Sequence, residues 1–108
     1  MYEYACTVRR VIDGDTLEVD ISLGFRLWYR ATIRLTGIDA PELKVKPYGL
    51  DARTHLEVLL AGKQSIIVHT TLNHEFEKYG RVLGAIFADG VNINQQMITD
   101  GHAAPMVY

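Results

Sequence analysis

The chain has 108 residues, of which 48% are hydrophobic and 22% charged, and its formal net charge is −2. This length predicts a single domain over residues 1–108, and the composition excludes an intrinsically disordered chain. The small negative charge argues against a strongly basic protein that coats nucleic acid, so any contact with nucleic acid has to be local.

Cys6 is the only cysteine, which excludes an internal disulfide and a thiolate metal cluster. We expect it to be a small core residue. No stretch approaches the roughly 18 consecutive apolar residues that a membrane span needs, and the N-terminus lacks a signal-peptide run. A single thiol suits a reducing compartment. We therefore expect a cytoplasmic monomer with no membrane partner, although the mature form of a secreted protein would have the same features.

The first half of the chain is typical of antiparallel strands. Residues 2–12 alternate loosely between apolar and polar side chains and predict a first strand. Asp13-Gly14 is a strong signal for a tight turn, because glycine accepts positive φ. Residues 16–23 then alternate strictly, which predicts a half-buried second strand.

A long third strand is predicted after Gly24, over residues 25–38. The three strands, joined by short turns, indicate an antiparallel meander. Trp28 and Tyr29 lie near the start of the third strand. Packing in the hairpin or core is their more common use, and stacking on a base is the alternative.

Residues 43–47 are expected to form a short loop, and residues 48–61 a helix with four apolar side chains on one face: Ala52, Leu56, Leu59 and Leu60. Gly62 is a suitable residue to end this helix.

The remaining pattern predicts strands at residues 65–70 and 81–88, separated by a polar loop at 71–79. Asn92 is placed to cap a short last helix that Gly101 ends. Five strands, with a helix between the third and fourth and a short C-terminal helix, predict a mainly β fold with some α: a five-stranded OB-type barrel.

Three separated segments each carry a charged group beside a turn. If the first three strands pair, Asp15 and Asp39 converge. Two carboxylates with backbone oxygens nearby form a hard, oxygen-only site that suits calcium or magnesium, and the lack of His and Cys in these segments argues against zinc. Arg34 and Arg81 each offer a planar fork to a phosphate, and Glu42 is placed to hold or deprotonate a water. This is the equipment for phosphodiester hydrolysis.

Three blocks of the sequence resemble the staphylococcal nuclease-like (thermonuclease) family: DGDT at 13–16, RLTGIDAPE at 34–42 and KYGR at 78–81. Their order and approximate spacing agree along nearly the whole chain. The resemblance implies an OB-fold with calcium-dependent phosphodiesterase activity on DNA and RNA, with little sequence preference.

The resemblance also implies a metal site. Carried over by position, Asp15 and Asp39 are the calcium carboxylates, and the backbone carbonyl of Ala40 is a third ligand. Ala40 replaces the threonine of the best-known member, a change that keeps the backbone ligand and removes a hydroxyl. Glu42 is the residue that positions or activates the attacking water.

The remaining implied roles concern phosphate and base. Arg34 and Arg81 correspond to the pair that binds phosphate and stabilises the transition state. Lys78 and Tyr79 correspond to contacts with a terminal phosphate of the substrate. Tyr108 is the only candidate for stacking on a base.

Two other functions fit the same sequence. A non-catalytic OB module would bind nucleic acid or a protein ligand, and a barrel with a structural calcium site would melt in a metal-dependent way without hydrolysis. A purely structural salt bridge is the alternative role for Arg34. The presence of all five site side chains favours the enzyme: Asp15, Arg34, Asp39, Glu42 and Arg81.

Overall fold

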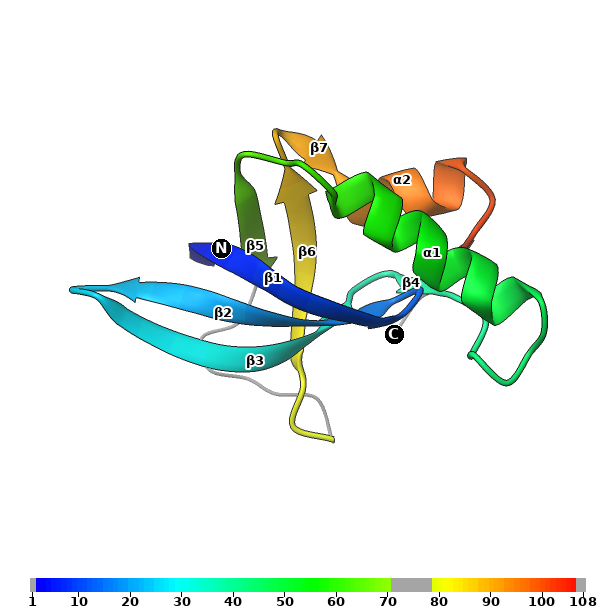
Figure 1. Cartoon of the computed structure of the whole chain (residues 1–108), viewed down its shortest axis with the longest axis horizontal. Coiled ribbons are helices and arrows are strands. Elements are labelled where there is room, and N and C mark those ends of the chain that lie inside the picture. The colour runs from blue at the N-terminus through cyan, green and yellow to red at the C-terminus, as the bar shows by residue number, and fades with distance from the viewer. Residues whose placement is uncertain (1, 71–78, 107–108) are drawn as a thin grey trace.

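The computed structural model describes residues 2–70 and 79–106. Five strands form the barrel: β1 (Tyr2–Asp13), β2 (Thr16–Gly24), β3 (Leu27–Leu35), β5 (Ile66–Thr70) and β6 (Val82–Ala88). They pair in the order β3-β2-β1-β5-β6, and a parallel pairing of β3 with β6 closes the barrel (Figure 1). The predicted mainly β, five-stranded OB-type fold is confirmed.

Two helices lie against the barrel. α1 (Tyr48–Leu60) follows the third strand and packs on β1, burying Ala52, Leu56 and Leu60 as the apolar spacing predicts. The short strand β7 (Val91–Asn92) leads directly into α2 (Ile93–Thr99). Asn92 caps α2 as expected, since its side chain accepts a hydrogen bond of 3.1 Å from the backbone N–H of Gln95. Neither helix is long and apolar enough to cross a membrane.

The core lies between the inner faces of the strands and the helices. Leu17, Val19 and Ile21 alternate inward along β2, and the predicted core position of Cys6 is confirmed. Asn94 ties α2 to the barrel, because its side chain accepts from the backbone N–H of Ile86 and donates to two carbonyls, those of Thr36 and Gly84. A buried amide with all these partners fixes where the helix docks.

The predicted third strand over residues 25–38 is wrong at both ends. Phe25 and Arg26 form the hairpin turn with φ of 54° and 63°, a left-handed conformation that disfavours side chains by about 1–2 kcal/mol per residue. β3 ends at Leu35, because Gly37 adopts a φ of 78° and turns the chain. Alternation of side chains carries no information about backbone handedness, so these breaks were not visible in the pattern.

The β2–β3 hairpin extends beyond the barrel as an arm (Figure 1). Trp28 and Tyr29 were expected to pack in the hairpin or the core; they lie on the hairpin arm and are exposed, so the core alternative is wrong. The barrel offers no inner face to them at that distance from its centre.

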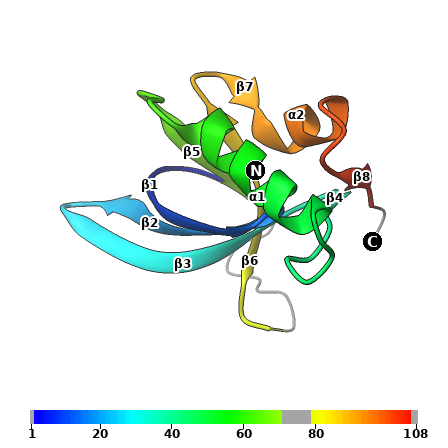
Figure 2. The same cartoon turned by 45° about the vertical axis from the view of Figure 1, so that its right-hand side comes forward.

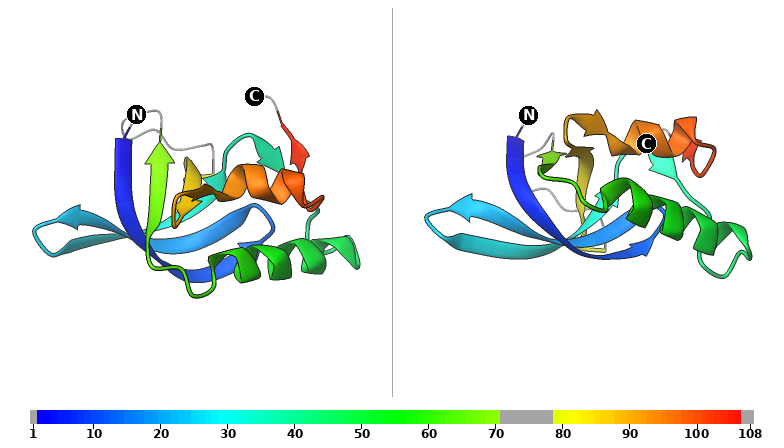
Figure 3. Two further views of the ribbon diagram at one scale, coloured as in Figure 1. Left: turned by 90° about the horizontal axis from the view of Figure 1, so that it is seen from above. Right: turned by 45° about the horizontal axis from the view of Figure 1, so that its top comes forward.

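A second, two-stranded sheet lies beside the barrel. β4 (Ile38–Asp39) pairs antiparallel with β8 (Ala104–Pro105), and the backbone N–H of Met106 donates to the carbonyl of Gly37 at 2.9 Å. Figures 2 and 3 show the two short strands side by side. The segment after α2 thus holds the backbone of Asp39 in place.

Candidate active site

Asp15 lies in the two-residue loop that joins β1 to β2, between the paired residues Asp13 and Thr16. A Cβ added to Gly14 would lie 2.7 Å from the Cβ atoms of both Ala40 and Ala52. Gly14 is therefore needed for close packing and not for positive φ, which corrects the reason given by the turn signal. The absence of a side chain lets the loop approach the segment that follows β4.

Hydrogen bonds fix both oxygens of the Asp15 carboxylate. The hydroxyl of Thr16 donates to Oδ1 at 3.0 Å, and the backbone N–H of Ala40 donates to Oδ2 at 2.9 Å. Asp15 is only 7% exposed. The carboxylate is consequently held in one orientation before any ligand arrives.

Arg34 joins the two predicted metal carboxylates. Its Nη1 donates to the carbonyls of Leu35 and Ile38 at 2.6 and 3.0 Å. Its Nη2 lies 3.3 Å from Oδ2 of Asp15 and 3.5 Å from Oδ1 of Asp39. The structure therefore brings Asp15 and Asp39 together around one nitrogen of a guanidinium that is 9% exposed.

The cluster opens to solvent on the side of Asp39, whose side chain is 66% exposed. A hollow of about 500 Å³ lies there, with Asp39 and Ala40 on one side and Tyr48 and His102 among its other lining residues. A ligand can thus reach the Asp39 carboxylate, whereas Asp15 is buried and does not line the hollow.

Glu42 follows on the surface between β4 and α1. Its carbonyl accepts from the backbone N–H of Val45 at 2.9 Å and packs against Gly49, where a Cβ would collide with it. Its carboxylate is exposed and pairs with Lys44 at 3.2 Å. The backbone of Glu42 is anchored to the first turn of α1, while its side chain faces water.

Arg81 directly precedes β6, the strand that pairs with β3 to close the barrel. The next residue, Val82, pairs with Ile33, the neighbour of Arg34 on β3. The guanidinium carbon of Arg81 lies 5.4 Å from the centre of the Tyr79 ring. Two other predicted substrate contacts, Lys78 and Tyr108, lie outside the described residues.

Asp13, Thr16 and Met106 belong to the site although sequence reasoning gave them no role in it. The backbone N–H of Asp15 donates to Asp13 at 3.0 Å; burial and the adjacent Asp15 carboxyl raise the pKa of Asp13 to about 6. Asp13 and Thr16 stand in the DGDT block, so that block already contained the signal. Met106 lies with its Sδ 3.8 Å from Nη2 of Arg34. No local sequence pattern predicts a contact between Arg34 and Met106, which are far apart in the chain.

The two carboxylates that the structure brings together here, those of Asp15 and Asp39, offer hard oxygen donors. Such donors fit calcium or magnesium and do not fit zinc. Within the described ranges no three His, Cys, Asp or Glu side chains form a metal-binding group. A cation here would therefore take its remaining ligands from water or from a phosphate.

Known proteins are similar to much of this chain. Residues 32–108 match the family described as staphylococcal nuclease homologue. The chain belongs to this family. The match begins on β3 and includes Arg34, Asp39, Ala40 and Glu42, whereas Asp15 precedes it.

Relatives within the family are similar over much of the chain. An "uncharacterized endonuclease" of Escherichia coli is 41% identical over 97 residues, which are 89% of this chain and 57% of the relative. A "probable staphylococcal-like nuclease" of Oryza sativa subsp. japonica is 42% identical over 71 residues, which are 66% of this chain and 18% of the relative. The chain thus spans little more than half of the bacterial relative and under one fifth of the plant one.

Proposed function

We propose that the chain is a calcium-dependent nuclease that hydrolyses phosphodiester bonds in DNA and RNA with low sequence specificity. The observation that carries the proposal is the buried guanidinium of Arg34, whose Nη2 lies within 3.5 Å of both Asp15 and Asp39. Family membership and the names of the relatives support the same class of reaction.

In this proposal Asp15, Asp39 and the carbonyl of Ala40 hold the calcium ion, which supplies positive charge to the scissile phosphate. The contribution of the chain is preorganisation. Thr16 and the N–H of Ala40 already fix the Asp15 carboxylate, so little reorganisation is needed when the substrate binds.

Arg34 and Arg81 are proposed to bind the phosphate and stabilise its charge in the transition state. The two Nη2 contacts of Arg34, at 3.3 and 3.5 Å, are longer than the roughly 2.8 Å of a strong charge-assisted hydrogen bond. That nitrogen therefore has capacity to donate to a phosphate oxygen, while the carbonyls of Leu35 and Ile38 keep the other nitrogen in place.

Glu42 is proposed to position the attacking water. Its ion pair with Lys44 lies on the surface, where such pairs contribute little and exchange readily, so the carboxylate is free to turn toward a bound phosphate. Lys78 and Tyr79 are proposed to contact a terminal phosphate, and Tyr108 to stack on a base.

The test is cleavage of fluorescently labelled single-stranded DNA and RNA, with calcium and then with a chelator. We expect calcium-dependent cleavage that falls by roughly 10²-fold or more in Glu42→Gln, because a positioned proton acceptor contributes on that scale. Glu57→Gln, which changes an exposed carboxylate of α1 in the same way, serves as the matched control and should retain activity.

Three outcomes would contradict the proposal. Binding of the oligonucleotide without cleavage would support a non-catalytic OB module. Calcium-dependent stabilisation without cleavage would support a structural metal site. Cleavage that survives the chelator would remove calcium from the mechanism.

A further inference from the structure

The end of the β2–β3 arm carries exposed apolar side chains that no part of the barrel covers. Five of them cluster in sequence around the turn: Leu23, Phe25, Leu27, Trp28 and Tyr29. Phe25 is 97% exposed. A contiguous group of this kind on a soluble domain is characteristic of a binding surface.

The arm also carries positive charge. Arg26 lies in the turn of the arm, Arg30 lies on β3, and Arg9 and Arg10 lie on the neighbouring strand β1. The ion pairs of Arg9, Arg10 and Arg30 involve two carboxylates, those of Glu18 and Asp20. Within this group four cations stand against two anions, although the whole chain carries −2. Glu3 and Asp13 lie near the two ends of β1, outside the group. A positive region on an acidic protein favours an anionic partner.

Two of these arginines are available to such a partner. Arg26 makes no ion pair with any described residue. Arg30 pairs with Asp20 at 3.1 Å, but its side chain is 57% exposed, and pairs in solvent are weak. A phosphate can therefore compete for both guanidinium groups.

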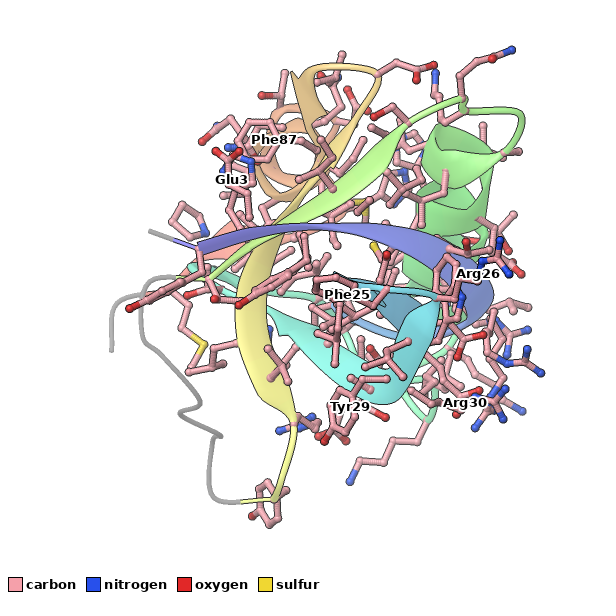
Figure 4. All side chains as sticks on the ribbon, turned by 90° about the vertical axis from the view of Figure 1, so that its left-hand side faces the viewer. Glu3, Phe25, Arg26, Tyr29, Arg30 and Phe87 are labelled. Carbon is pink, nitrogen blue, oxygen red and sulfur yellow. The ribbon has the colours of Figure 1, made fainter. Side chains whose placement is uncertain are left out.

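Figure 4 views the arm from its tip and shows how these side chains are divided. Phe25 and Tyr29 lie toward one side, and Arg26 and Arg30 toward the other. A ring surface beside a row of cations matches the bases and phosphates of a nucleic-acid strand, since bases stack on aromatic rings while arginines bind the backbone.

The backbone of the turn gives an independent reason. Phe25 and Arg26 both adopt left-handed φ, of 54° and 63°, where Asn-Gly is strongly preferred in a two-residue hairpin. Backbone strain of this kind persists mainly where a side chain serves a function. Folding alone would not favour a phenylalanine and an arginine at these positions.

The arm is continuous with the candidate active site. Strand alternation puts Trp28, Arg30, Thr32 and Arg34 on one face of β3, each roughly 7 Å from the next. Trp28 and Arg34 mark the two ends of this path, which is roughly 20 Å long. A strand of several nucleotides can follow it, whereas a dinucleotide cannot.

We propose that the β2–β3 arm is a second binding site, in which Phe25, Arg26, Trp28 and Arg30 hold single-stranded nucleic acid that extends from the phosphate bound at Arg34. The inference rests on the proposed nuclease function and names the form of substrate that it favours. Because the path along β3 is extended, affinity should depend on the length of the substrate. The chemistry at Arg34 should not depend on the arm.

The decisive variant is the double substitution Phe25→Asn with Arg26→Gly, which keeps the two-residue turn and relieves its strain. We expect a higher melting temperature together with about tenfold weaker binding of a twelve-nucleotide single strand, the scale of losing one stacked base. The slope of log affinity against log salt should fall by about 0.7, because one phosphate contact is lost. The Michaelis constant should rise for the long strand, with turnover at saturation and cleavage of a dinucleotide unchanged.

Trp28→Ala should weaken binding of the long strand by a similar factor. Val58→Ala removes an exposed apolar side chain from α1 and is the matched control, for which we expect unchanged binding. Higher stability of the double variant with unchanged affinity and salt slope would overturn the inference. The inference would also be overturned if the double substitution abolished self-association, or binding to anionic vesicles, and left the affinity for the oligonucleotide unchanged.

Binding is measured in chelator by fluorescence anisotropy, so the result does not depend on cleavage. If the wild type does not cleave but the double variant binds the oligonucleotide more weakly, the binding site on the arm is supported and the nuclease function is rejected. If the wild type and the double variant cleave with the same dependence on substrate length, the nuclease function is supported and the binding site on the arm is rejected.

Discussion

Asp15 and Arg34 form a buried pair in which each side chain compensates the charge of the other. Asp15 is 7% exposed and Arg34 9% exposed, with Nη2 and Oδ2 at 3.3 Å. Removal of one partner leaves an uncompensated charge in a region of low dielectric, so this contact affects folding as well as the phosphate binding that we propose for Arg34. Mutational effects on activity at this position therefore have to be separated from effects on stability.

A double-mutant cycle makes that separation. Arg34→Ala should lower the free energy of unfolding by about 3 kcal/mol, because the Asp15 carboxylate remains buried without its cation. Asp15→Asn in the same chain should restore part of that stability, since a neutral amide needs no counter-charge, and should leave activity at least 10²-fold reduced. Urea unfolding measures the first effect and oligonucleotide cleavage the second. Strictly additive losses of stability would show that the two side chains do not interact.

Cys6 gives a pH-dependent prediction at the same scale. Burial raises the pKa of its thiol from an ordinary value of 9.0 to about 11. The folded state holds the proton more tightly, so this contribution to stability is complete below pH 9 and is lost as the pH rises toward 11. Cys6→Ala should show a smaller loss of stability between those pH values than the wild type. A native thiol that reacts with a thiol reagent at pH 8 as fast as free cysteine would contradict the burial.

At the scale of elements, the site depends on contacts between turns and short strands. The β1–β2 loop packs on Ala40 because Gly14 has no side chain, and β8 holds β4 so that Asp39 lies next to Arg34. Each of these elements is too short to be stable alone. Their positions depend on their neighbours: the β1–β2 loop approaches α1, and β4 contacts α2.

Gly14→Ala tests this dependence. The new methyl group would approach Ala40 and Ala52 to 2.7 Å, so the loop must move away from Ala40 and weaken the hydrogen bond to Asp15. We expect a loss of about 1–3 kcal/mol, typical of overpacking, together with reduced cleavage. Gly62→Ala is the control, because Gly62 has a φ of 70° with open space around it. Gly62→Ala should lower the free energy of unfolding by about 1 kcal/mol through backbone strain and keep its activity. Equal loss of activity in Gly14→Ala and Gly62→Ala would show that Gly14 has no specific role in the site.

At the scale of the whole molecule, barrel closure connects the two halves of the site. The parallel pairing of β3 with β6 places the residue after Arg81 opposite the residue before Arg34, although they are far apart in the chain. Folding is therefore coupled to assembly of the site. A ligand that binds only the assembled site raises the stability of the complete fold.

Calcium should accordingly raise the melting temperature of the wild type. At a hundredfold excess over its dissociation constant, it should add about 2.7 kcal/mol to the free energy of unfolding. Asp39→Asn is the informative variant, because Asp39 is 66% exposed and its replacement leaves the core intact. It should melt near the wild-type temperature without calcium and lose most of the calcium-dependent increase. An undiminished increase in Asp39→Asn, measured by calorimetry, would place the calcium elsewhere.

Local pattern predicted much of this molecule. Strict alternation over residues 16–23 matches β2, and the apolar spacing before Gly62 matches α1, because these periods are set by the geometry of strands and helices themselves. Asn92 caps α2 as its side chain predicts. The third strand was predicted too long, since Gly24 indicated the turn but Phe25 and Arg26, which continue it, are not turn-forming residue types.

The sequence by itself determined the order of the five barrel strands and two helices, the OB-type fold and the residue types available for chemistry with phosphate, because all three depend on local periodicity and side-chain identity. Tertiary structure alone decided that Arg34 joins Asp15 to Asp39, that Met106 lies beside that guanidinium, and that the aromatic arm is exposed. These features arise from packing and strand pairing between distant segments. Close approach at Gly14 and closure of β3 on β6 bring those segments together, and no local pattern encodes such distances.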